Sequence, residues 1–181
     1  MKRALVREWP DSPPRLLTPL ARDESRAFSR LLRRPFYVIS DTHFFHRNVI
    51  GYVGRPADHR FSAEIAPKLT GEKYLLLGSH DKQAVDYASL GFEVIRPFAI
   101  EYFGYEISFS HWPMRPGEIQ PGERRIRVHG HIHNRGYGSS AELGEVWSPL
   151  GAINVSVEVV DYTPVPISEL LIEAIARRND V

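Results

Sequence analysis

Short apolar runs that each end in a histidine-bearing polar cluster are the feature that most constrains the fold of this chain. The runs predict buried strands at 36–40, 74–78, 105–110 and 126–130. The clusters at their ends are Asp41-Thr-His43, Gly78-Ser-His-Asp81, Ser110-His-Trp112 and Gly130-His-Ile-His133. Because the carboxyl ends of strands in a layered α/β domain meet at one edge, we expect these side chains to line one cleft.

The residue types in these clusters point to a metal site. The chain has no cysteine, which excludes disulfides, thiolate zinc sites, iron–sulfur clusters and cysteine nucleophiles. Imidazole and carboxylate groups are typical ligands of divalent transition metals. In the D-x-H and H-x-H spacings, alternate residues of an extended backbone would face the same side. A single histidine at a strand end is more often structural, but four such clusters favour a shared metal site. The histidines outside this prediction are His46, His59 and His129.

The remaining elements follow from periodicity and from glycine and proline positions. A hairpin is expected around Gly104, and a loop rich in proline, glycine and charge at 113–125. Further strands are predicted at 92–95, 98–103 and 152–159, and helices at 19–33, 61–69, 81–90 and 167–178.

With 181 residues, the chain is long enough for one domain and an appendage. We divide it into a basic, Pro/Arg-rich amino-terminal extension with one helix, residues 1–34, and a main domain, residues 35–181. The extension holds nine Lys or Arg and four Asp or Glu, whereas the main domain holds fourteen Lys or Arg and eighteen Asp or Glu. A basic arm could contact nucleic acid, an acidic partner or its own domain, but it lacks interleaved aromatics, so nucleic-acid binding is unsupported.

No apolar stretch approaches the roughly 20 residues that cross a bilayer, so we expect no membrane partner and a cytoplasmic location. The sequence leaves the oligomeric state open.

The clusters resemble the motifs of the calcineurin-like metallophosphoesterases, which run D-x-H, G-D, G-N-H-D, a histidine after a strand, and G-H-x-H. The likeness is greatest to the small bacterial and phage members and covers roughly residues 36–175. It rests on the stretches 39–50, 69–81 and 154–158 and on Arg55-Pro56. The resemblance implies an α/β fold, a four-layer α-β-β-α sandwich of two mixed β-sheets flanked by helices.

The resemblance also implies a role for each cluster. Asp41, His43 and His133 would hold one metal, while His111 and His131, with Ser79, would hold the other. His80 would be the acid near the leaving group, and Asp81 would either orient His80 or cap a helix. The implied activity is that of a hydrolase: metal-dependent hydrolysis of a phosphoester, monoester or diester, through a metal-activated water.

Two departures from the family pattern weaken the second metal. The G-D carboxylate that bridges both metals is missing, and the acids available between the first two clusters are Asp58, Glu64 and Glu72. Asp58 or Glu64 could replace it. Ser79 stands where the family has Asn, and a neutral hydroxyl is a poorer ligand for a hard cation. We therefore expect one firmly held divalent ion (Mn, Fe, Zn or Ni), a second that is weak or absent, and impaired two-metal catalysis.

The same departures favour an alternative function. A catalytically degenerate protein of this fold would serve as a metal-binding or protein-interaction module, and the basic extension suits that reading. The substrate, and whether it is a monoester or a diester, stays open. Arg115 and Arg135 could contact a phosphate, although both suit ordinary loop charges better.

Overall fold

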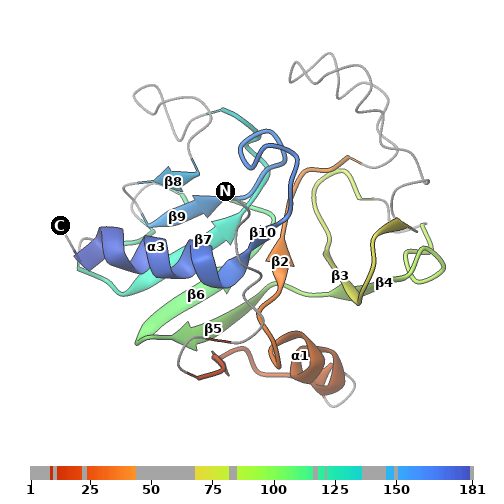
Figure 1. The fold of residues 1–181 in the computed structure, drawn as a ribbon, viewed down its shortest axis with the longest axis horizontal. Helices are drawn as coiled ribbons and strands as arrows, with labels where there is room; N and C mark the ends of the chain where they lie inside the picture. Colours follow the sequence, from red (N-terminus) through yellow and green to blue (C-terminus); the bar gives the residue numbers. More distant parts are fainter. Residues whose placement is uncertain are drawn as a thin grey trace.

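A six-stranded mixed sheet forms the centre of the computed structural model (Figure 1). Its strands lie in the order β1-β5-β6-β7-β9-β8, with parallel pairing of β6 with β7 and of β7 with β9. Their bounds are Arg15–Leu16 (β1), Phe98–Tyr102 (β5), Tyr105–Phe109 (β6), Arg125–His129 (β7), Trp147–Ser148 (β8) and Ala152–Asn154 (β9). The structure describes residues 9, 12–21, 24–43, 68–81, 85–115, 118–120, 122–135, 146–148 and 151–179.

The predicted hairpin around Gly104 is confirmed. Phe103 and Gly104 both have positive φ, 51° and 73°, and connect β5 to β6 in a two-residue turn. Burial alternates along both strands, as expected for a sheet that packs on one face only. The buried set is Phe98, Ile100 and Tyr102 on β5 and Tyr105, Ile107 and Phe109 on β6. This face of the sheet forms the core.

Two short sheets accompany the central sheet within the described residues. Strands β3 (Lys73–Leu76) and β4 (Phe92–Ile95) pair in parallel, and β2 (Tyr37–Val38) pairs antiparallel with β10 (Val165–Pro166). Beyond β2, Ser40 donates its N–H to the Val155 carbonyl at 2.7 Å and accepts from the Val157 N–H at 3.0 Å. These bonds fix the segment before Asp41 beside the segment after β9.

Two helices bury apolar side chains in the same core. Helix α1 (Ser25–Leu31) contributes Ala27, Phe28 and Leu31, while α3 (Ile167–Asn179) contributes Ile167, Leu170, Leu171 and Ala174. In Figure 1, α3 lies across the sheet in front of β7 and β9. The predicted α/β class is confirmed, whereas the four-layer arrangement stays a prediction.

Several predicted bounds were wrong. The helix expected at 81–90 is absent from its described part, because residues 85–91 form bends and turns. Helix α1 is shorter than the predicted 19–33, and β9 ends at Asn154, five residues before the predicted end. The helix expected at 61–69 lies almost wholly outside the described residues.

The amino-terminal segment packs on the domain and supplies an edge strand that the sequence did not predict. Strand β1 pairs with β5, and Arg15 forms an ion pair with Glu101. Trp9 is only 8% exposed, and its indole N–H donates to the Leu32 carbonyl at 3.0 Å. Its ring lies 5.3 Å from that of Tyr102 between centroids. The described part of residues 1–34 therefore contributes side chains to the core.

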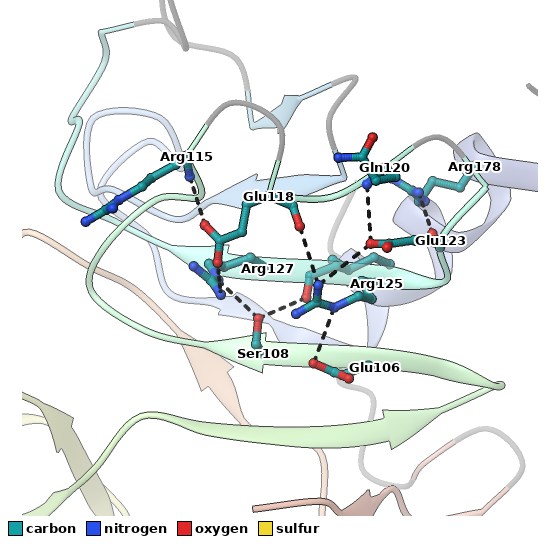
Figure 2. Close-up of polar contacts among 10 residues, drawn as sticks. Glu106, Ser108, Arg115, Glu118, Gln120, Glu123, Arg125, Arg127 and Arg178 are labelled. Atoms are coloured by element: carbon teal, nitrogen blue, oxygen red, sulfur yellow. Dashed lines mark hydrogen bonds and ion pairs between the residues drawn. The ribbon is translucent and has the colours of Figure 1, made fainter.

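A charged network on the opposite face of β6 and β7 anchors the loop that follows His111 (Figure 2). Arg127 contacts Glu118 at 2.9 Å, and its Nε donates to the Ser108 hydroxyl at 3.2 Å. Glu118 also accepts from the Arg115 N–H at 2.9 Å. That bond is the main reason why the pKa of Glu118 lies below its usual range: burial raises this pKa, but the bond and the nearby charge of Arg127 together lower it more. The chain is thus held to the sheet on both sides of this loop.

Candidate metal centre

The predicted site residues converge, although they come from four separate segments. They follow β2 (Asp41, His43), β3 (Ser79, His80), β6 (His111) and β7 (His131, His133). His43 Nε2 lies 3.2 Å from His133 Nε2, and His111 Nε2 lies 3.0 Å from His131 Nδ1. The structure therefore brings the predicted residues together at one end of the strands.

Asp41, His43 and His133 form a group that could hold a metal ion. One ligand atom of each lies within 4.8 Å of the others, and all three side chains are half-buried. The set combines one carboxylate oxygen with two imidazole nitrogens, which suits a divalent transition metal. Three protein ligands leave coordination positions open, as catalytic sites require.

Asp41 is held by hydrogen bonds on one carboxylate oxygen. Its Oδ2 accepts from the His131 N–H at 2.7 Å and from the hydroxyls of Ser40 and Ser156, both at 2.9 Å. A side-chain carbon at Gly130 would overlap Ser40 Oγ and Asp41 Oδ2, so only glycine fits there. These three bonds fix the position of the Asp41 carboxylate.

The same contacts keep Asp41 ionised. Burial raises the pKa of its carboxyl group, but the charge of His133 and the bonds from the His131 N–H and Ser40 together lower it more. The pKa therefore lies below its ordinary value, and Asp41 carries a negative charge at neutral pH.

His111 and His131 form a second pair next to the first group. Burial lowers the pKa of both imidazoles, and the charge of Asp41 restores only part of the loss. Neutral imidazole is the form that binds metals. Ser79 Oγ lies 3.3 Å from His111 Nε2, so the predicted serine does sit beside this pair.

Glu158 supports His133 from behind, a role that the sequence analysis missed. His133 donates from Nδ1 to Glu158 Oε1 at 3.1 Å, and only 5% of the glutamate side chain is exposed. This bond turns Nε2 of His133 toward His43. Asn154 adds a second support, since its Nδ2 donates to the His133 carbonyl at 2.8 Å. Both residues lie in the stretch 154–158, which the sequence analysis had used for the family resemblance and which could have indicated their role.

The reason given for the convergence of the paired ligands was wrong. Asp41, His43, His131 and His133 do not alternate along an extended strand: all four have positive φ, between 50° and 73°. Such a conformation costs about 1–3 kcal/mol for a residue other than glycine, and it persists where surrounding structure imposes it. Left-handed turns after β2 and β7 therefore bring the ligands together.

His80 is exposed, and its ring lies 5.1 Å from that of His43 between centroids. Asp81 accepts from the Gly78 N–H at 2.6 Å and from the Tyr87 hydroxyl at 3.4 Å. Asp81 therefore closes the 78–81 turn, the segment that presents His80. Whether it also caps a helix, as one prediction had it, lies outside the described residues.

The remaining candidates lie elsewhere or outside the described residues. Glu72 is exposed and pairs with Arg30 at 3.4 Å, on β3's outer side. His129 is buried, donates from Nδ1 to the Gly130 carbonyl at 2.7 Å, and has its pKa lowered to about 4 by burial. His129 is therefore a structural histidine, as expected. Asp58, Glu64, His46 and His59 are not among the described residues.

Neither α1 nor α3, the helices of the described segments, is long and apolar enough to span a bilayer.

Comparisons with known proteins add the fold but no activity. No protein-family model matches the chain. The uncharacterized protein MJ1445 of Methanocaldococcus jannaschii is 26% identical over 179 residues, an alignment that covers 80% of this chain and 93% of the relative. The crystal structure of the protein of unknown function AQ665 from Aquifex aeolicus is similar with a TM-score of 0.50 and 23% identity. That match covers 74% of this chain and 96% of the other.

Proposed function

We propose that this protein is a metal-dependent phosphoesterase that resembles the calcineurin-like metallophosphoesterases and holds one divalent cation on Asp41, His43 and His133. The observation that carries the proposal is the approach of these three ligand atoms to within 4.8 Å of one another. The buried Glu158 behind His133 supports it, because metal-binding histidines commonly donate their other ring nitrogen to a carboxylate.

A divalent cation at this position supplies positive charge for the phosphoryl oxygens and lowers the pKa of a water molecule. The protein side chains do the rest. Asp41 contributes a negatively charged carboxylate oxygen, and His43 and His133 contribute imidazole nitrogens. His80, exposed and next to His43, can donate a proton to the departing oxygen.

A second cation would bind weakly. His111 and His131 offer two neutral nitrogens, and Ser79 offers a hydroxyl 3.3 Å from His111. The carboxylates that the structure describes near the site are Asp41, Asp81 and Glu158, and each accepts hydrogen bonds from other groups. The ionic ligand that would hold two cations together is thus missing from the described residues.

That same absence supports the alternative function, a catalytically degenerate module that binds a metal or a protein partner. The two functions differ in one measurable property. The enzyme turns over a phosphoester in a way that depends on His80, whereas the module binds the metal without turnover.

The metal assignment is tested by Asp41→Asn with Asp161→Asn as its matched control. Both aspartates have positive φ, 54° and 50°, a conformation that asparagine tolerates, so neither change strains the backbone. We expect Asp41→Asn to lower the metal content after gel filtration at least about tenfold, because a charged ligand is lost. Asp161→Asn should retain it, since Asp161 is exposed and is not one of the three grouped ligands. Equal metal content in the two variants would contradict the assignment.

The activity is tested with Mn²⁺ and the mono- and diesters of p-nitrophenol, followed by the corresponding phenyl esters. A proton donor matters most for a poor leaving group. We expect His80→Ala to slow phenyl ester hydrolysis about 100-fold, within the usual range for acid catalysis, and p-nitrophenyl ester hydrolysis much less. Metal content should be unchanged. No hydrolysis of any of the four esters would leave the binding module as the function, whereas equal non-zero rates of the unaltered protein and the variant would contradict the role of His80.

A further inference from the structure

Trp112 is an exposed tryptophan at the rim of the candidate metal centre. It directly follows His111, and 53% of its surface is exposed. Its ring centroid lies 4.1 Å from that of His131 and 5.2 Å from that of His111. A large aromatic surface thus stands open to solvent beside the paired histidines.

The other two tryptophans of the chain are used differently. Trp9 lies in the core at 8% exposure, and the ring of Trp147 is covered by the guanidinium of Arg177, 5.4 Å from its centroid. Trp112 therefore differs from both in the amount of apolar surface that it leaves in water, which burial under a ligand would remove.

The position of Trp112 is fixed by its surroundings. Ser110 donates its hydroxyl to the Trp112 carbonyl at 2.7 Å, and proline follows at position 113. The charged network of Glu118 and Arg127 holds the next part of the loop to the sheet (Figure 2). The ring itself packs on His131, and a ring on a backbone held in this way loses little conformational freedom when a ligand stacks on it.

We infer that Trp112 stacks on a planar aromatic group of the substrate, and that the substrate class is therefore a nucleoside phosphate. An indole accepts any base, because every base has a π face. The phosphate of this substrate would lie at the Asp41, His43 and His133 group. Only the placement of the phosphate rests on the proposed function; the stacking on Trp112 does not.

The test compares two ligands that differ only in the base. The full-length protein, loaded with Zn²⁺, is titrated by calorimetry with AMP and with ribose 5-phosphate, and product analysis verifies that neither is consumed. Stacking makes AMP bind about tenfold more tightly than ribose 5-phosphate. Trp112→Ala should remove this ratio, and Trp112→Phe should keep most of it. The control Phe103→Ala removes an equally exposed aromatic (49%) on the β5–β6 turn and should leave the ratio unchanged.

Equal affinity of the unaltered protein for the two ligands would overturn the inference, and so would an AMP preference that survives in Trp112→Ala. If Trp112→Ala loses zinc, the inference is judged from the ratio of AMP to ribose 5-phosphate affinity in the unaltered protein and in Trp112→Phe. The result is separable from the proposed activity. A base-dependent affinity without ester hydrolysis would leave this inference standing and remove the enzyme. Hydrolysis of p-nitrophenyl esters together with equal affinity for AMP and ribose 5-phosphate would support the enzyme and overturn this inference.

Discussion

His133 donates from Nδ1 to a buried oxygen of Glu158 at 3.1 Å, and this bond leaves Nε2 as the nitrogen that faces His43. The bond fixes both the tautomer and the ring orientation of a candidate ligand before any cation arrives. Partners of this kind are common behind metal-binding histidines, and their loss typically weakens metal binding. Glu158 is therefore a supporting residue of the candidate metal centre, although it is not one of the grouped ligands.

We expect Glu158→Gln to lower metal affinity about 10- to 100-fold without unfolding the protein. The glutamine oxygen can still accept from His133, so the variant removes the charge and keeps the bond. Competition with a chelating dye measures the affinity. Glu173→Gln is the matched control, because Glu173 is exposed on α3 and pairs only with Arg177 in the contacts described here. An equal effect of the two changes would contradict the role of Glu158.

A second prediction concerns Gly130. Because an added Cβ would overlap Ser40 Oγ and Asp41 Oδ2, Gly130→Ala must displace the carboxylate of Asp41. We expect loss of metal together with a lower free energy of unfolding. Gly71→Ala serves as the control. Nothing lies within 4 Å of a Cβ added at Gly71, so this change has only the conformational cost of placing alanine at a φ of +90°. Metal content in Gly71→Ala should match that of the unaltered protein. Normal metal content in Gly130→Ala would show that Asp41 is not where metal binds.

A third prediction follows from His129, whose pKa falls from 6.5 to about 4 on folding. Between these values the unfolded chain binds a proton that the folded chain does not, so the free energy of unfolding decreases as the pH falls through this window. The difference corresponds to about 3 kcal/mol. Urea denaturation of the chelator-treated protein at pH 7 and pH 4 measures how much the free energy of unfolding falls. In His129→Gln, this fall should be smaller by about 3 kcal/mol. Identical losses in both proteins would contradict the assignment.

A fourth prediction tests the amino-terminal segment. Trp9 is buried against Tyr102 and Phe36, so Trp9→Ala should lower the free energy of unfolding by about 3–5 kcal/mol. Phe103→Ala, at an exposed turn, should cost less than about 1 kcal/mol. Denaturant midpoints provide the comparison. A small loss in Trp9→Ala would place the segment outside the core.

The sequence predicted elements best where local signals were strong. The β5–β6 hairpin combined alternating apolar residues with Gly104, and both strands were found at those positions. Strand β4 was predicted at its observed bounds for a similar reason. By contrast, β1 is two residues long and follows two prolines, so no local pattern could indicate it. Its pairing with β5 is a tertiary contact.

The same limit applies to the site. The histidine clusters indicated which side chains would meet, because strand ends converge in an α/β fold. They could not show that Asp41 and His133 lie in left-handed turns, since non-glycine residues adopt that conformation only under tertiary constraint. Nor could they assign Glu158 to His133, a pair separated by 25 residues. Partner choice of this kind depends on how β9 and the turn after β7 are placed.

The pairing of β1 with β5 also has a consequence during translation. Arg15 and Glu101 are 86 residues apart, so the ribosome releases the first strand long before its partner exists. At about 5–20 residues per second, the delay is roughly 4 to 17 s. Throughout that interval Trp9 lacks Tyr102 as a neighbour, and β1 lacks the strand with which it pairs. Trp9 and β1 can therefore reach their native contacts only after β5 has been made.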